Sequence, residues 1–118
     1  MKFTNHLTVI EKSYSYAKSL STGKPEKVRI NSELSDDTLY VRIFNYPMNC
    51  CIDSIGCSPE LDADTLIMRV KEHFVEICEC FTKFDIKIKI YPVQGKPNYF
   101  RIYKDDLIKP CFEGKEEL

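Results

Sequence analysis

Basic and aromatic residues alternate with aliphatic residues in four segments of this chain, and cations combined with aromatic rings are suited to binding anionic partners. At the two-residue period of a β-strand, these side chains would share one exposed sheet face that contains no acidic residue. The predicted face consists of Lys27, Arg29, Tyr40, Arg42, Phe44, Lys87, Lys89, Tyr91, Tyr99, Arg101 and Tyr103. Because the formal net charge of the chain is only -1, such a face requires that the surface charges be segregated.

The composition of this face favours an acidic protein as the partner. Tyrosine and arginine are enriched at the hot spots of protein interfaces, so we predict a small non-enzymatic binding protein. Small proteins without catalytic motifs are often accessory inhibitors or adaptors of phages or mobile elements, and this general class, rather than any particular residue, is the reason for expecting that type. Cations also neutralise phosphates, and aromatic rings stack on unpaired bases with about 1 to 3 kcal/mol per base. Single-stranded nucleic acid or a nucleotide is therefore the alternative partner. A homodimer formed through the same face would hide it.

Acidic residues in the middle of the chain could bind a divalent cation. Asp62 and Asp64, with Glu60 and Asp53 nearby, could supply the carboxylate ligands that Mg²⁺ needs in a nuclease. Acidic residues at the start of a predicted helix are also ordinary capping residues that interact favourably with the helix dipole. A divalent-metal nuclease is thus the second alternative, and the main prediction is a protein without catalytic residues.

Six cysteines and two histidines are the candidate nucleophiles and soft metal ligands. No C-x-x-C pair is present, so a zinc site would need ligands that only the tertiary fold brings together. His6 and His73 are expected to be solvated helix residues, which leaves no imidazole to activate a cysteine. Because the N-terminus lacks a signal-peptide core, we expect a cytoplasmic protein with reduced thiols, no disulfide, no metal and no cofactor.

The elements that would position the basic and aromatic side chains follow from hydrophobic periodicity. Apolar residues recur at steps of three and four over residues 3–20, and again from residues 58–64 to residue 83, which is the spacing of one helix face. They alternate with polar residues over residues 27–31, 38–45, 85–92 and 98–104, as in half-buried strands. Turn-forming residues separate the strands within each pair, so we predict two hairpins. Residues 46–57 are predicted to be an ordered loop.

The order helix, strand, strand, helix, strand, strand predicts an α+β fold with one four-stranded antiparallel sheet. Both helices would pack on its apolar face and leave the basic and aromatic face to solvent. At 118 residues the chain suffices for a single domain, assigned to residues 1–109, with residues 110–118 as a polar C-terminal tail. No segment approaches the roughly 18 apolar residues of a membrane span, so no membrane partner is expected.

Overall fold

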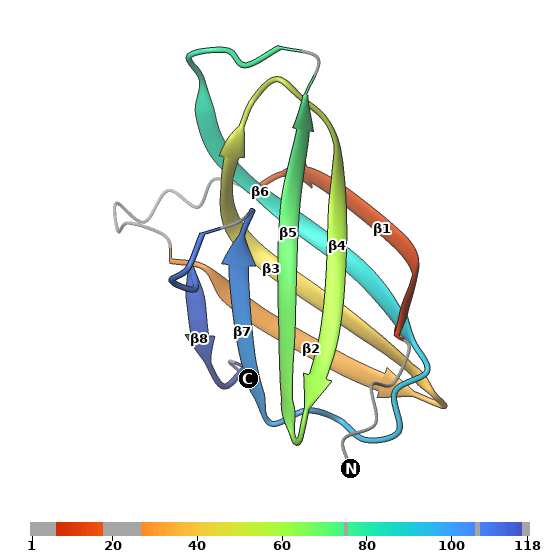
Figure 1. Cartoon of the computed structure of the whole chain (residues 1–118). Coiled ribbons are helices and arrows are strands. Elements are labelled where there is room, and N and C mark those ends of the chain that lie inside the picture. Colours follow the sequence, from red (N-terminus) through yellow and green to blue (C-terminus); the bar gives the residue numbers. More distant parts are fainter. Residues whose placement is uncertain (1–6, 18–26, 75, 106, 117–118) are drawn as a thin grey trace.

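The chain folds into two stacked β-sheets. The structure is a computed structural model that describes residues 7–17, 27–74, 76–105 and 107–116, and it contains no α-helix in these ranges. Its strands are β1 (Thr8–Tyr16), β2 (Arg29–Ser35), β3 (Thr38–Asn49), β4 (Ile52–Asp62), β5 (Thr65–Phe74), β6 (Phe81–Tyr91), β7 (Tyr99–Lys104) and β8 (Phe112–Gly114). Sheet A has the strand order β1-β6-β3-β2, and sheet B has the order β4-β5-β7-β8. Figure 1 shows the strands of sheet B crossing over those of sheet A as a separate layer.

The hydrophobic core lies between the two sheets and is built from alternate residues of the central strands. Successive side chains of a strand point to opposite faces of the sheet, so one half of each strand faces the core and the other half faces solvent. The buried set includes Leu39, Val41, Ile43, Ile86, Ile88 and Ile90 from sheet A and Leu66, Met68, Val70, Phe100 and Ile102 from sheet B. Burial of these side chains is the main favourable contribution to the fold.

The first predicted helix is wrong, because residues 8–16 form strand β1 and pair with β6. A register shift between Val9 and Glu11 displaces the alternation by one residue, and Ile10 is left 55% exposed. Leu7 and Tyr14 pack against the core whereas Ile10 does not, so these residues share no face, and their spacing of three and four resembled a helix face only in the sequence. The remainder of that predicted helix, residues 3–6 and 18–20, lies outside the described residues.

The second predicted helix is also wrong, because residues 58–83 contribute to strands β4, β5 and β6. Leu66, Val70 and Phe74 are four residues apart, and this spacing fits both one turn of a helix and two periods of a strand. Pairing of β5 with β4 and β7 decides in favour of the strand. The prediction of an α+β protein is therefore corrected to an all-β protein with two sheets of four strands.

The last two predicted strands exist, but they do not form a hairpin. Strand β6 lies in sheet A, whereas β7 lies in sheet B, parallel to β5. The connection between them, residues 92–98, is hydrogen-bonded to one turn in each sheet. Val93 N donates to Asp37 O, in the β2–β3 turn of sheet A, at 2.8 Å, and Asn98 N donates to Asp64 O, in the β4–β5 turn of sheet B, at 2.9 Å. Strands β2 and β3 do form the predicted hairpin, with a turn at residues 36–37.

Segments expected to be irregular also contain strands. Strand β3 extends to Asn49 and β4 begins at Ile52, inside the predicted loop over residues 46–57. Strand β8 lies within the predicted tail over residues 110–118 and pairs with β7. In the described part of the chain, no helix has the length and the apolar character needed to cross a membrane.

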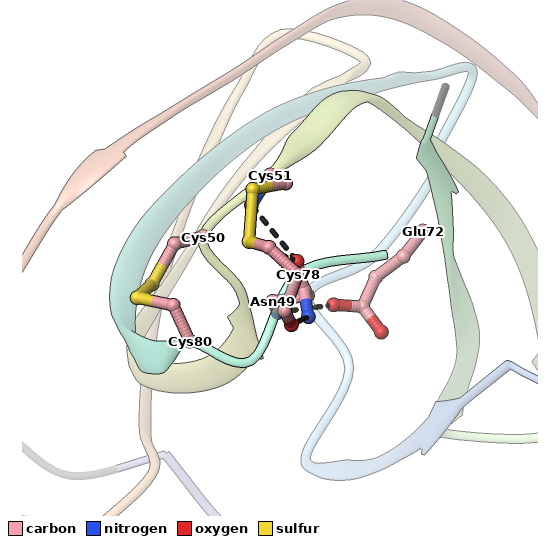
Figure 2. Close-up of a disulfide and its surroundings, with 6 residues drawn as sticks. All are labelled: Asn49, Cys50, Cys51, Glu72, Cys78 and Cys80. Atoms are coloured by element: carbon pink, nitrogen blue, oxygen red, sulfur yellow. Dashed lines mark hydrogen bonds between the residues drawn. A yellow bond between two sulfur atoms is a disulfide. The ribbon is translucent and has the colours of Figure 1, made fainter. Parts of the chain in front are cut away.

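Two disulfides close one end of the sandwich, which corrects the expectation of six reduced thiols. Cys50 bonds to Cys80 and Cys51 to Cys78, with Cα atoms 5.3 Å and 5.9 Å apart. As Figure 2 shows, these bonds join the turn between β3 and β4 to the segment between β5 and β6. The adjacent cysteines do not bond to each other, and each takes its own partner from the C-x-C segment over residues 78–80.

A buried asparagine fixes the two disulfide-linked segments to the rest of the fold. The backbone N–H of Asn49 donates to Glu72 Oε1 at 2.7 Å, and its Nδ2 donates to the carbonyl oxygen of Cys78 at 2.6 Å. Its Oδ1 accepts from the backbone N–H of Cys51 at 2.9 Å (Figure 2). Buried polar groups are costly unless they are hydrogen-bonded, and these contacts satisfy most of the asparagine side chain.

Candidate binding face

The predicted basic and aromatic residues are divided between the two sheets, so they do not share one surface. Sheet A carries Arg29, Tyr40, Arg42, Phe44, Lys87, Lys89 and Tyr91 on the side away from the core, with Lys27 exposed two residues before the start of β2. Tyr99, Arg101 and Tyr103 belong to β7, on the outer side of sheet B. The single-face expectation failed because strand parity gives the face of a residue within its own sheet, and not which sheet contains the strand.

Two cations on the outer side of sheet B are already paired within the described residues, although Lys71 on the same side is exposed. Arg101 Nε lies 2.6 Å from Glu113 Oε2 across the β7–β8 pair. Arg69 Nη1 donates to the carbonyl oxygens of Asp105 and Leu107 at 3.0 and 3.2 Å, and its guanidinium lies 4.5 Å from the centre of the Tyr103 ring. These residues therefore stabilise sheet B and its adjoining loop, and they offer little free charge to a partner.

The outer side of sheet A contains a hollow of about 460 Å³. All four strands contribute to its lining, which consists of Glu11, Ser13, Asn31, Glu33, Ser35, Tyr40, Val41, Arg42, Lys87, Ile88 and Lys89. We call this surface the sheet A hollow. Its side chains are arranged in rows that run across the strands, because paired residues of neighbouring strands lie side by side.

The first row contains Glu11, Lys89, Tyr40 and Glu33, one residue from each strand. Lys89 Nζ lies 3.0 Å from Glu11 Oε2 and 5.4 Å from the centre of the Tyr40 ring. The hydrogen bond to Glu11 raises the pKa of the Lys89 ammonium group. The charge of Lys89 is therefore balanced within the row, and acidic side chains stand at both ends of it.

The second row contains Ser13, Lys87, Arg42 and Asn31, with the two cations directly opposite each other on β6 and β3. In the parts of the chain that the structure describes, neither Arg42 nor Lys87 has an ion pair or a side-chain hydrogen bond. Like charges directly opposite each other in a sheet are destabilising. The row thus places two uncompensated cations in the middle of the sheet A hollow, between a hydroxyl and an amide group.

Two residues further along the strands, the charges are again mixed. The guanidinium of Arg29 lies 5.0 Å from the centre of the ring of Phe44, its partner across the β2–β3 pair. The carboxylate of Asp85 accepts a hydrogen bond of 3.2 Å from the backbone N–H of Asn45. The cations of the second row are therefore bordered by acidic groups on both sides.

Sequence reasoning missed the acidic and neutral residues of this surface. Glu11 and Ser13 were assigned to a helix, and Glu33 to the loop between two strands. The prediction that this face contains no acidic residue is therefore wrong. A weak signal for Glu33 was present, because Ile30 and Leu34 have the same parity, although the polar Ser32 interrupts the apolar alternation between them.

Asp62 and Asp64, the predicted nuclease residues, lie at the turn between β4 and β5. Asp64 accepts hydrogen bonds from Asn98 through both its backbone carbonyl oxygen, at 2.9 Å, and its Oδ2, at 3.3 Å. Among the described residues, no three histidine, cysteine or acidic side chains are grouped in a way that could hold a metal ion. Asp64 thus has a structural role in holding the connection between β6 and β7.

The two cysteines outside the disulfides are poor nucleophiles. Burial raises the pKa of the Cys57 thiol to about 11, although the charge of Lys12 opposes this shift. Desolvation also raises the pKa of Cys111, against the opposing influence of the nearby Tyr46 hydroxyl. Since a thiolate is the reactive form, neither residue is activated for catalysis.

The fold and the hollow define the chain as an all-β sandwich protein with a cationic depression on one sheet. No family model, no curated protein and no solved structure matches it.

Proposed function

We propose that this chain is a non-enzymatic binding protein, an accessory inhibitor or adaptor, that binds an acidic protein partner in the sheet A hollow. The observation that carries the proposal is the placement of Arg42 opposite Lys87 without a carboxylate for either cation among the described residues. An arrangement that weakens the free protein is explained if a partner supplies the missing negative charge.

The chemistry around these cations supports a protein surface as the partner. Arginine and tyrosine are the residues enriched at interface hot spots, and both Arg42 and Tyr40 line the hollow. The hollow also offers the Ser13 hydroxyl and the Asn31 amide group, which can donate hydrogen bonds to oxygen atoms of a partner. An interface with a cationic centre and polar borders gives specificity through charge complementarity.

The two disulfides bear on where the protein would act. Structural disulfides persist in oxidising compartments and are rare in the cytosol of mesophiles. We therefore propose that the binding takes place in an oxidising compartment, in place of the cytoplasmic location expected from the sequence.

An affinity purification tests the proposal. The oxidised protein is immobilised and exposed to extract and culture medium, each with and without nuclease treatment, and retained proteins are identified by mass spectrometry. The wild type should retain a protein that the double variant Arg42→Glu, Lys87→Glu does not retain. The matched control is Lys71→Glu, which reverses an exposed cation on the outer side of sheet B and should retain the same protein.

Retention should also decrease with added salt, because charge pairs at an exposed interface are screened. Recovery of the same protein by the double variant, with an unchanged amount, excludes the sheet A hollow as the interface. Retention that is lost only after nuclease treatment indicates that nucleic acid is the partner and contradicts the proposal.

A further inference from the structure

The geometry points to a more specific ligand: we infer that the sheet A hollow receives a single carboxylate side chain of the partner, presented without a second acidic residue beside it. This inference rests on the function proposed above and names the chemistry that the hollow recognises. The second row is the receiving site, and the rows on its two sides limit what can accompany the carboxylate.

The second row has the donors that one carboxylate needs. Side chains directly opposite each other in a sheet have Cβ atoms about 4.5 to 5.5 Å apart, so one anionic group can contact both Arg42 and Lys87. The arginine offers two parallel N–H groups, which match the two oxygens of a carboxylate, and the lysine adds a compact positive charge. Ser13 and Asn31, next to the cations in the same row, can donate further hydrogen bonds.

The first row opposes a second anion on one side. Positions two residues apart along a strand are separated by about 6.8 Å, which is shorter than the screening length of roughly 8 Å at physiological ionic strength. A second carboxylate at that distance would meet Lys89, which is already paired with Glu11, and the acidic side chains of Glu11 and Glu33. Repulsion from these two residues is not offset by a free cation in the same row.

The opposite side is mixed in charge as well. Arg29 lies over the ring of Phe44 there, and Asp85 contributes a carboxylate on the neighbouring strand. The row that attracts an anion thus lies between the first row, which lines the hollow, and a row of mixed charge just outside it. A polyanion with a charge at every unit, such as a nucleic acid strand or a run of glutamates, would be attracted by the central row. It would be repelled by Glu11 and Glu33 on one side and would meet no net positive charge on the other, where Arg29 and Asp85 balance each other.

Nuclear magnetic resonance titration of the ¹⁵N-labelled protein tests the inference with three probes. These are the capped peptide Gly-Ser-Glu-Ser-Gly, the capped peptide Gly-Glu-Glu-Glu-Gly, and a short oligothymidylate. The single-glutamate peptide should shift the amide signals of Ser13, Asn31, Arg42 and Lys87, and the shifts should be lost in Arg42→Gln. The amide spectrum of each variant shows independently whether it is folded.

The border residues provide the decisive comparison. In the double variant Glu11→Gln, Glu33→Gln, affinity for the triple-glutamate peptide and for the oligothymidylate should rise severalfold, while affinity for the single-glutamate peptide should change much less. Binding of either polyanion to the wild type about tenfold more tightly than the single-glutamate peptide, a difference of roughly 1.4 kcal/mol, would overturn the inference. So would the absence of any shift with the single-glutamate peptide.

The two proposals can fail separately. A protein partner that depends on Arg42 and Lys87, together with tighter binding of the triple-glutamate peptide, leaves the proposed function in place and removes the single-carboxylate inference. Localised shifts with the single-glutamate peptide, together with no protein partner that depends on these cations, support carboxylate binding in the hollow and contradict the proposed function.

Discussion

Glu116 Oε2 accepts hydrogen bonds from both the backbone N–H of Ser32, at 2.6 Å, and its hydroxyl group, at 2.9 Å. Ser32 lies in β2, the edge strand of sheet A, and its N–H donates to this carboxylate in place of a neighbouring strand. The second oxygen of Glu116 forms an ion pair with Lys96. An unpaired edge is a site for association with another strand, so this contact partly covers the edge of sheet A.

Replacement of Glu116 by glutamine should make the stability of the protein less dependent on pH. Burial alone raises the pKa of this carboxyl, but hydrogen bonds from Lys96 and Ser32 lower it by more, so its net pKa lies below the ordinary value. A lowered pKa stabilises the folded state above the pKa of the unfolded chain, and this contribution is lost as the pH falls through the folded pKa. Glu116→Gln should therefore be less stable than the wild type by about 1 kcal/mol at neutral pH, and the difference should disappear in acid.

Urea denaturation at a series of pH values measures this effect. Glu113→Gln is the matched control, because Glu113 also pairs with a cation but is 44% exposed at its side chain. A stability difference for Glu116→Gln that is the same at neutral and acid pH would show that the charge of Glu116 is not involved.

Neutralising either cation of the second row should stabilise the free protein. Arg42→Gln or Lys87→Gln removes a repulsion between directly opposite like charges, for which a gain of about 0.2 to 1 kcal/mol is expected. The gain should shrink at high salt, since the repulsion is screened. Urea denaturation at low and high ionic strength gives the measurement, with Lys71→Gln as the control on sheet B. A loss of stability in Arg42→Gln would mean that this residue has a structural partner in the folded protein.

The strands of sheet A that were predicted from sequence are those in which the alternation is strict. Ile86, Ile88 and Ile90 alternate with charged residues in β6, and a helix would spread these isoleucines around its surface, so that only a strand could bury them together. Strand β5 was misread because its apolar residues at positions 66, 70 and 74 fit both periods. Only its pairing with β4 and β7, which the sequence does not contain, resolves this ambiguity.

The candidate site was predictable only in part for a similar reason. Tyr40, Arg42, Lys87 and Lys89 do lie on one face of one sheet, because parity within β3 and β6 is unambiguous and these two strands pair with each other. Strand β7 lies in sheet B and not beside β6, and the connection over residues 92–98 is positioned by hydrogen bonds to turns far away in the sequence. One of these bonds joins Val93 to Asp37. The position of Glu11 depends on the bulge in β1. No periodic pattern encodes either feature.

The two disulfides should be strongly non-additive in their effect on stability. They close nearly the same loop, with sequence separations of 30 and 27 residues, and a single loop of this length is expected to contribute about 3 to 4 kcal/mol. Once one bond has closed the loop, the second restricts the unfolded chain little further. Removing one pair, as in Cys51→Ser, Cys78→Ser, should therefore cost much less than removing both pairs.

Urea denaturation of the two double variants and of the quadruple variant checks this expectation. The control replaces Cys57 and Cys111 by serine, which should leave both disulfides in place. Equal and additive losses from the two pairs would show that each bond stabilises the folded state through local contacts, and not through the unfolded chain.

Alkylation should distinguish Cys57 from an ordinary thiol by its dependence on pH. With a pKa of about 11, raised by burial, Cys57 carries a thiolate fraction of only about one in a thousand at pH 8, so iodoacetamide should react with it about a hundredfold more slowly than with a free cysteine. Its rate should continue to rise as the pH approaches 11, whereas the rate of an unperturbed thiol levels off above pH 9. Because the charge of Lys12 lowers this pKa, Lys12→Gln should slow the reaction further, and Lys71→Gln should not. Mass spectrometry of the modified peptide gives the rates, and a plateau below pH 9 would show that the Cys57 thiol is not buried as described.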